Sequence, residues 1–178
     1  FYLYWLPKFL DANFGVKLAG VALPLIVIYL VADVGSVGGG WVSSALIKRG
    51  WTVNAGRKTA LLIPALLIVP TMFAPHAKSL WVAVAIVSVA AAAHQWWSAN
   101  LFTTASDMFP RRAVASVVGI GGFAGAMGGV LFQRATGRIL EATNNNYSLI
   151  FMVCGLAYVT ALLVMHLIVP RLQPAALD

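Results

Sequence analysis

Charged side chains are scarce in this sequence. Only 10% of the 178 residues are Asp, Glu, Lys or Arg, against about 25% in a typical soluble domain, while 61% are apolar. The mean hydropathy is accordingly high, at +0.87. A soluble domain of this length has too little interior to bury so much apolar surface. The scarcity of charge excludes an ordinary soluble domain and predicts an all-α membrane protein, a bundle of helices in a lipid bilayer.

Cysteine is nearly absent as well. The one cysteine, Cys154, lies in an apolar run, so the sequence predicts no internal disulfide and no thiolate metal site. The three histidines are scattered and the five acids do not pair at helical spacing, so no metal-ligand or catalytic pattern is present. We therefore expect no metal, no cofactor and no enzymatic activity.

Long apolar segments are what the sequence does contain. A spanning helix needs about 20 mostly apolar residues, and five segments reach or approach that length: residues 20–46, 59–75, 80–106, 113–131 and 149–170. The aromatic and apolar opening, residues 1–10, resembles the exit end of a further helix. We expect six membrane helices, of which the first is incomplete.

Basic residues lie in short clusters between these segments. They are Lys48, Arg49, Arg57 and Lys58, then Arg111 and Arg112, and finally Arg171. Such clusters do not form the continuous stripe of a nucleic-acid surface, and cytoplasmic loops carry an excess of Lys and Arg. We expect these alternate connections to be cytoplasmic. Arg134 and Arg138 fall after residues 113–131, in a connection on the opposite side.

Small residues recur at every fourth position in two segments. Gly35, Gly39 and Ser43 form one such row, and Gly121, Gly125 and Gly129 form another. Small-residue rows let membrane helices approach closely. Static close packing and a sliding surface in a protein that changes shape are both open interpretations.

Asp33 lies near the middle of a long apolar segment. A carboxylate at bilayer depth is costly and usually faces a cavity, a partner or an ion path. Two roles are open: proton coupling or gating, and a structural hydrogen bond or ion pair to another helix.

Residues 91–107 hold the second polar concentration. His94, Gln95 and Ser98 share one arc of the predicted helix, whereas Trp96, Asn100 and Asp107 occupy nearly the opposite arc. We expect one arc to line a cavity and the other to meet a neighbouring helix; the sequence does not distinguish them. Amide, hydroxyl and indole groups beside aromatic faces suit a polyhydroxylated ligand.

Several stretches carry a family resemblance. GWVSSALIKRGWTVNAGRK, residues 40–58, resembles the cytoplasmic loop between helices eight and nine of the major facilitator superfamily. The matching motif residues are Gly40, Lys48, Arg49, Gly50, Arg57 and Lys58. More specific are FYLYWLPKFL, LPLIVIYLVADVGSVGGGW, AAAHQWWSANLFTTASDMFPRRAVASVVGIGGFAGAMGG and the final HLIVPRL. Together they resemble hexuronate transporters of the anion:cation symporter family, over nearly the whole chain.

This resemblance implies a C-terminal six-helix half, with residues 1–178 running from the end of helix seven through helix twelve and an N-terminal half missing. It implies proton-coupled uptake of glucuronate or galacturonate by alternating access, as a multi-pass protein of the inner (plasma) membrane. The substrate-binding candidates are His94, Gln95, Trp97, Ser98 and Asn100. No cationic side chain is expected near mid-helix, so we expect the residue that pairs with the anion to lie in the N-terminal half.

Two alternatives remain. A passive channel or a structural membrane subunit fits the composition equally well, with only Asp33 and the polar residues 94–100 against it. A symporter for another sugar acid or carboxylate fits the same motifs.

Overall fold

The computed structural model describes residues 2–174, and in this part of the chain every regular element is helical. The elements are α1 (Tyr2–Phe14), η1 (Leu18–Gly20), α2 (Ala22–Lys48), α3 (Val53–Ile68), η2 (Val69–His76), α4 (Leu80–Met108), α5 (Arg111–Ala142) and α6 (Ser148–Ile168). Residue 1 and residues 175–178 lie outside the described residues, and with them Phe1 of the aromatic opening stretch.

The predicted spanning segments are confirmed. Five helices are long and apolar enough to cross a membrane, with α3 and η2 together counted as one of them. α1 has 13 residues, which at about 1.5 Å per residue is shorter than a hydrocarbon core of about 30 Å. The protein is thus an all-α membrane protein.

One boundary prediction was wrong. Arg134 and Arg138 do not lie in a connection, because α5 continues to Ala142. The apolar run that marks a span in the sequence stops at residue 131, but the backbone hydrogen bonding of a helix does not depend on hydropathy. The helix ends where Asn144 and Asn145 adopt positive φ angles of 50° and 62°, a conformation that asparagine tolerates better than most residues.

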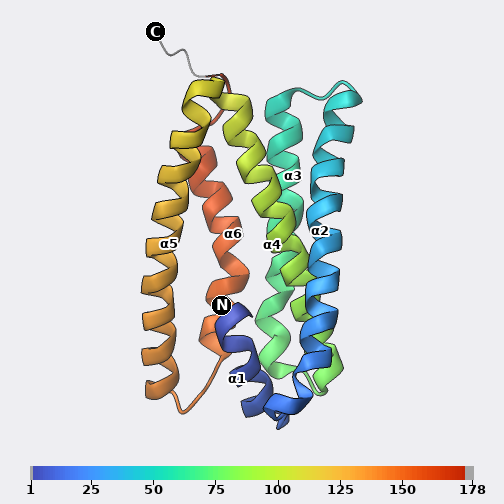
Figure 1. Ribbon diagram of the computed structural model, residues 1–178, viewed down its shortest axis with the longest axis vertical. Helices are drawn as coiled ribbons and strands as arrows, with labels where there is room; N and C mark the ends of the chain where they lie inside the picture. Colours follow the sequence, from blue (N-terminus) through green and yellow to red (C-terminus); the bar gives the residue numbers. More distant parts are fainter. Residues whose placement is uncertain (1, 175–178) are drawn as a thin grey trace.

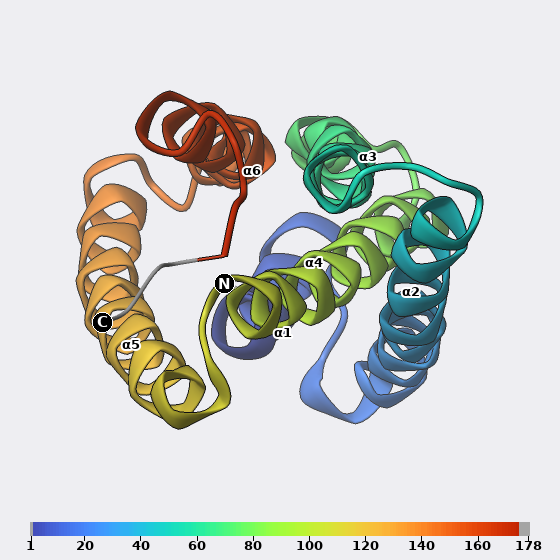
Figure 2. The same ribbon diagram turned by 90° about the horizontal axis from the view of Figure 1, so that it is seen from above.

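The long helices run up and down side by side, so alternate connections lie at the same end (Figure 1). The turn between α2 and α3, the turn between α4 and α5, and the chain after α6 are all at the upper end. These are the connections to which the sequence assigned the basic clusters. Seen along the bundle, α4 lies centrally while α5 lies at the edge (Figure 2).

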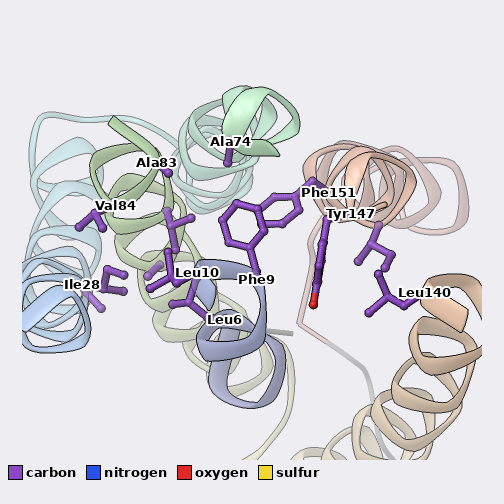
Figure 3. Close-up of a cluster of buried hydrophobic side chains, with 14 residues drawn as sticks. Leu6, Phe9, Leu10, Ile28, Ala74, Ala83, Val84, Leu140, Tyr147 and Phe151 are labelled. Carbon is purple, nitrogen blue, oxygen red and sulfur yellow. The ribbon is translucent and has the colours of Figure 1, made fainter. Parts of the chain in front are cut away.

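The short helix α1 anchors the lower end of the bundle. Its side chains Leu6, Phe9 and Leu10 are fully buried, and Phe9 points toward the rings beside α6 (Figure 3). The Phe9 ring centroid lies 4.7 Å from that of Phe151 and 5.3 Å from that of Tyr147. Such aromatic contacts add to the apolar burial, and α1 thereby links α4 to α6.

α2 and α4 make the closest helix contact. A Cβ atom added to Gly35 would overlap the backbone of Ala92, and one added to Gly39 would lie 2.5 Å from Cγ of Trp96. Both contacts are closer than real Cβ atoms come to other atoms, so this crossing requires glycine at residues 35 and 39. The close helix approach that a small-residue row allows is therefore confirmed for α2. On α5, by contrast, Cβ atoms at residues 121, 125 and 129 would meet nothing within 4 Å among the described residues.

We predict that Gly35→Ala destabilises the protein whereas Gly38→Ala does not. The new methyl group at residue 35 meets rigid backbone and forces α2 away from α4, at a cost of about 1 to 3 kcal/mol. A Cβ at Gly38, on the same helix, meets nothing within 4 Å, and alanine there lowers the entropy of the unfolded chain. Thermal unfolding in detergent micelles measures both. Equal midpoints for the two variants would contradict the tight crossing.

Candidate functional site

A cavity of about 510 Å³ opens between α2, α4 and α6. This volume is in the range of small-molecule sites, about 300 to 1,000 Å³. Most of the lining is apolar, with Leu6 contributed by α1 and Phe132 by α5. The polar and titratable lining residues are Tyr29, Asp33, His94, Gln95, Cys154 and Tyr158. A mainly apolar cavity with a few convergent polar groups is the usual form of a ligand site.

Three of the predicted site residues meet in this cavity. Asp33 comes from the middle of α2, and His94 and Gln95 come from the middle of α4. The structure therefore decides which arc of α4 does what: the arc with His94 and Gln95 lines the cavity. Because α2 contacts α4 at Gly35, Asp33 lies close to this arc of α4.

The opposite arc of α4 packs against its neighbours. Asn100 is buried, and its Nδ2 donates hydrogen bonds to the carbonyl oxygens of Gly39 (3.0 Å) and Trp96 (3.1 Å). Asn100 thus joins α4 to α2 at the glycine crossing. It is not among the residues that line the cavity.

Trp97 and Ser98 also lie outside the cavity lining. The Trp97 side chain is 8% exposed and packs in a cluster with Leu61 and Ala65 of α3. Ser98 is half-buried.

Like Tyr29 on α2, Tyr158 on α6 is a cavity residue that the sequence analysis missed. Its hydroxyl group hydrogen-bonds to Nδ1 of His94, and its ring packs edge-on against Trp97, with centroids 5.2 Å apart. A signal was present, because Tyr158 is the one tyrosine within the apolar α6. Its hydroxyl needs a partner at bilayer depth, and the sequence alone does not identify that partner.

The basic motif residues form a second polar site, at the upper end of the bundle. Arg57 is 7% exposed; its Nε donates to Oδ2 of Asp107 at 2.6 Å and its guanidinium donates to Oγ of Ser43 at 2.8 Å. One side chain of α3 is thereby bonded to both α4 and α2. A buried charge is tolerated when it is paired and hydrogen-bonded in this way.

Lys58 connects α3 to the chain after α6. Its Nζ donates to the carbonyl oxygens of Val169 (3.0 Å) and Pro170 (2.6 Å) and lies 2.9 Å from Nδ1 of His166. These carbonyls follow the end of a helix and have no intrahelical partner. A cation is favourable at that position.

The placement of the motif differs from the sequence prediction. Arg57 and Lys58 were expected in a connecting loop, but α3 begins at Val53, because the Thr52 hydroxyl accepts a hydrogen bond from the Ala55 amide at 3.2 Å and caps the helix. Hydropathy missed this polar first turn. The remaining motif residues lie in α2 or directly after it. Gly40 is within α2 and Lys48 is its last residue. Arg49 caps the helix, and Gly50 turns the chain with a φ angle of +90°.

A search of protein-family models finds no match to this chain. Among known proteins, it is 28% identical over 139 residues to the hexuronate transporter of Escherichia coli K12, covering 77% of this chain and 32% of that protein. It is 24% identical over 141 residues to the D-galactonate transporter of Escherichia coli O6:H1, covering 79% of this chain and 33% of that protein.

A plant protein is similar over more of the chain. The chloroplastic ascorbate transporter of Arabidopsis thaliana is 26% identical over 168 residues, which cover 93% of this chain and 30% of that protein. The chain thus spans about a third of the length of the relatives that it matches. These relatives are named as transporters and not as enzymes.

We predict that Asp107→Asn destabilises the protein more than Glu141→Gln. The first change leaves the buried Arg57 guanidinium without its counter-charge, which costs about 3 to 5 kcal/mol in a fully buried pair. Because Asp107 is 29% exposed, we expect a smaller loss of about 1 to 3 kcal/mol. Glu141 is exposed and serves as the control. Thermal unfolding in detergent distinguishes them, and an unchanged midpoint for Asp107→Asn would refute a stabilising ion pair.

Proposed function

We propose that this chain is the C-terminal half of a secondary transporter for small organic anions, with hexuronates such as glucuronate and galacturonate as the first candidates. The observation that carries the proposal is the cavity in which Asp33, His94 and Gln95 converge at the middle of spanning helices. Polar and ionisable groups at this depth are costly and mark substrate or ion pathways. The named substrates of the relatives, a hexuronate, galactonate and ascorbate, are all sugar acids and support the same ligand class.

The cavity suits such a ligand chemically. A sugar hydroxyl both donates and accepts, and the Gln95 amide has a donor and an acceptor to match. The apolar lining suits the carbon face of the ring. We assign Gln95 and His94 to direct contact with the substrate. Trp97 packs against α3 and Asn100 against α2, so both would support the site by holding α4 in place. Ser98 lies one turn beyond His94 on α4.

Alternating access requires a second half. We propose that residues 1–178 form one bundle, from the end of helix seven through helix twelve, and that it works against an N-terminal six-helix half in the inner (plasma) membrane. The matched residues cover only 32 to 33% of the two bacterial relatives, which leaves room for a second half in each of them. The Arg57 and Lys58 contacts would then hold the cytoplasmic end of this half together as it moves.

Proton coupling is assigned to Asp33. It is an exposed carboxyl group within the cavity, and a symporter needs a group whose proton affinity changes between the two states of the cycle. A gating role for the same side chain is the alternative.

A passive channel or a structural membrane subunit is the competing class. The few polar groups that converge in this mainly apolar cavity favour a carrier, because they suit a bound ligand, whereas a channel needs a continuous path. Counterflow distinguishes the two classes. Vesicles that contain a carrier and are loaded with unlabelled substrate transiently concentrate labelled substrate, whereas vesicles that contain a channel do not.

We predict that Gln95→Ala weakens sugar-acid binding by about 1 to 3 kcal/mol, since a desolvated hydrogen bond to the ligand is lost. Asn100→Ala, one and a half turns away, should instead lower stability, because it removes the bond to the Gly39 carbonyl. Glucuronate binding by isothermal calorimetry and thermal unfolding, both on the full-length protein, separate the two effects. Unchanged affinity in Gln95→Ala would remove Gln95 from the site.

We predict that Asp33→Asn abolishes uphill, pH-driven uptake of glucuronate but leaves counterflow largely intact. The amide keeps the size and hydrogen bonding of the side chain and removes its titration, while exchange does not require the proton to leave. Full-length protein in proteoliposomes provides both assays. Concentrative uptake by the variant would eliminate the coupling role, and absence of counterflow in the wild-type protein would overturn the carrier itself.

A further inference from the structure

His94 is the one residue lining the cavity, among those that the structure describes, whose side chain becomes a cation when it binds a proton. It lies at the midpoint of α4. The lysines and arginines of the spanning helices lie toward the helix ends, as Lys48, Arg57 and Arg111 illustrate. A carboxylate ligand in this cavity therefore has the imidazole of His94 as its available positive partner within this chain.

The hydrogen bond to Tyr158 suits an imidazole that changes its protonation state. The bond uses Nδ1 and leaves Nε2 for another partner. A phenol hydroxyl both donates and accepts, so it can donate to Nδ1 of the neutral ring or accept from the imidazolium. Tyr158 comes from α6 and packs edge-on against the ring of Trp97 at 5.2 Å, which restricts the hydroxyl group to the His94 side. The ring orientation is thus maintained in both states.

We propose that His94 binds the carboxylate of the transported anion in its imidazolium form, so that one proton and one anion occupy the cavity together. This inference rests on the proposed function and adds the pairing residue to it. The imidazole takes one proton from water, and the imidazolium and the carboxylate then carry no net charge as a pair. A neutral pair costs less at bilayer depth than either ion alone. When the anion leaves, the imidazolium has lost its counter-charge and gives this proton back to water on the same side, in addition to the proton that is proposed above to be carried by Asp33.

Other titratable groups line the cavity together with His94. α2 contributes Tyr29 and Asp33, and α6 contributes Cys154 and Tyr158, while the cavity residues of α1 and α5 are Leu6 and Phe132 and α3 contributes none. Asp33 is the acid in this set. It lines the same cavity as His94 but, in the part of the chain that the structure describes, forms no ion pair with it, so its negative charge would repel an arriving substrate carboxylate. The pH dependence of binding must therefore be assigned with variants of both residues.

The test measures the affinity of the full-length protein for glucuronate between about pH 5.5 and pH 8. If anion binding requires the imidazolium, the dissociation constant of the wild-type protein should rise with pH, by up to about tenfold per pH unit above the titration of His94. His94→Gln should bind weakly at every pH, with this slope lost. Asp33→Asn should keep a rising slope. The methyl ester of glucuronate, which has no carboxylate, should bind the wild-type protein with little pH dependence.

Tyr158→Phe and proton uptake add independent measurements. Tyr158→Phe removes the hydroxyl group but leaves the ring, so affinity should fall while the slope with pH remains, as expected of a positioning residue. In weakly buffered solution, the wild-type protein should take up protons when glucuronate binds at the upper end of the pH range. This measurement needs no variant and therefore still applies if His94→Gln does not fold.

The outcomes separate this inference from the function on which it rests. A full pH slope in His94→Gln, or a slope abolished in Asp33→Asn alone, would overturn the role of His94 and leave the transporter proposal standing. Glucuronate binding by the wild-type protein without proton uptake at any pH would also overturn it. Absence of binding of any sugar acid, at any pH, would instead reject the proposed function.

Discussion

The close approach of α2 and α4 is the constraint on which the rest of the structure depends. In lipid, apolar side chains gain little by meeting each other, so helices associate through close packing and interhelical hydrogen bonds. Gly35 and Gly39 remove the side chains that would keep the two backbones apart, and Asn100 adds a hydrogen bond at the same crossing. The crossing places Asp33 in the cavity that His94 also lines, and it brings Ser43 within reach of Arg57.

Polar groups with a structural role and polar groups available to a ligand lie at different depths of the bundle. At the upper end, Arg57 and Lys58 bond to an acid, a hydroxyl group and free carbonyl oxygens on neighbouring elements, so their charges stabilise the fold. At mid-depth, Asp33 and Gln95 line the cavity, and among the described residues neither side chain is bonded to another helix, so they are available to a ligand. His94 is intermediate, since Tyr158 holds one nitrogen of its ring.

Most of the fold could be predicted from the sequence, because a span needs a long apolar run whatever its neighbours are. The ends of the helices could not, since capping by Thr52 and the positive φ angles of Asn144 and Asn145 depend on local backbone geometry that hydropathy does not report. For the site, the polar arc of α4 could be recognised from the helical spacing of its residues, and Asp33 from the free-energy cost of a carboxylate in lipid. Tyr158 could not be recognised, because a tyrosine in an apolar helix has many possible partners and the sequence does not show which of them is close in space.

The sequence by itself determined the class of the protein: its apolar runs make it a bundle of membrane helices, and its small-residue rows make at least one close helix crossing possible. Only the tertiary structure decided how those features are used. Both glycine rows have the same spacing, yet the row on α2 is packed against α4 and the row on α5 meets nothing among the described residues. Likewise, both arcs of α4 are polar, yet one lines the cavity and the other packs. The physical reason is that periodicity defines the faces of a helix, whereas the partner of each face is set by contacts between residues far apart in the chain.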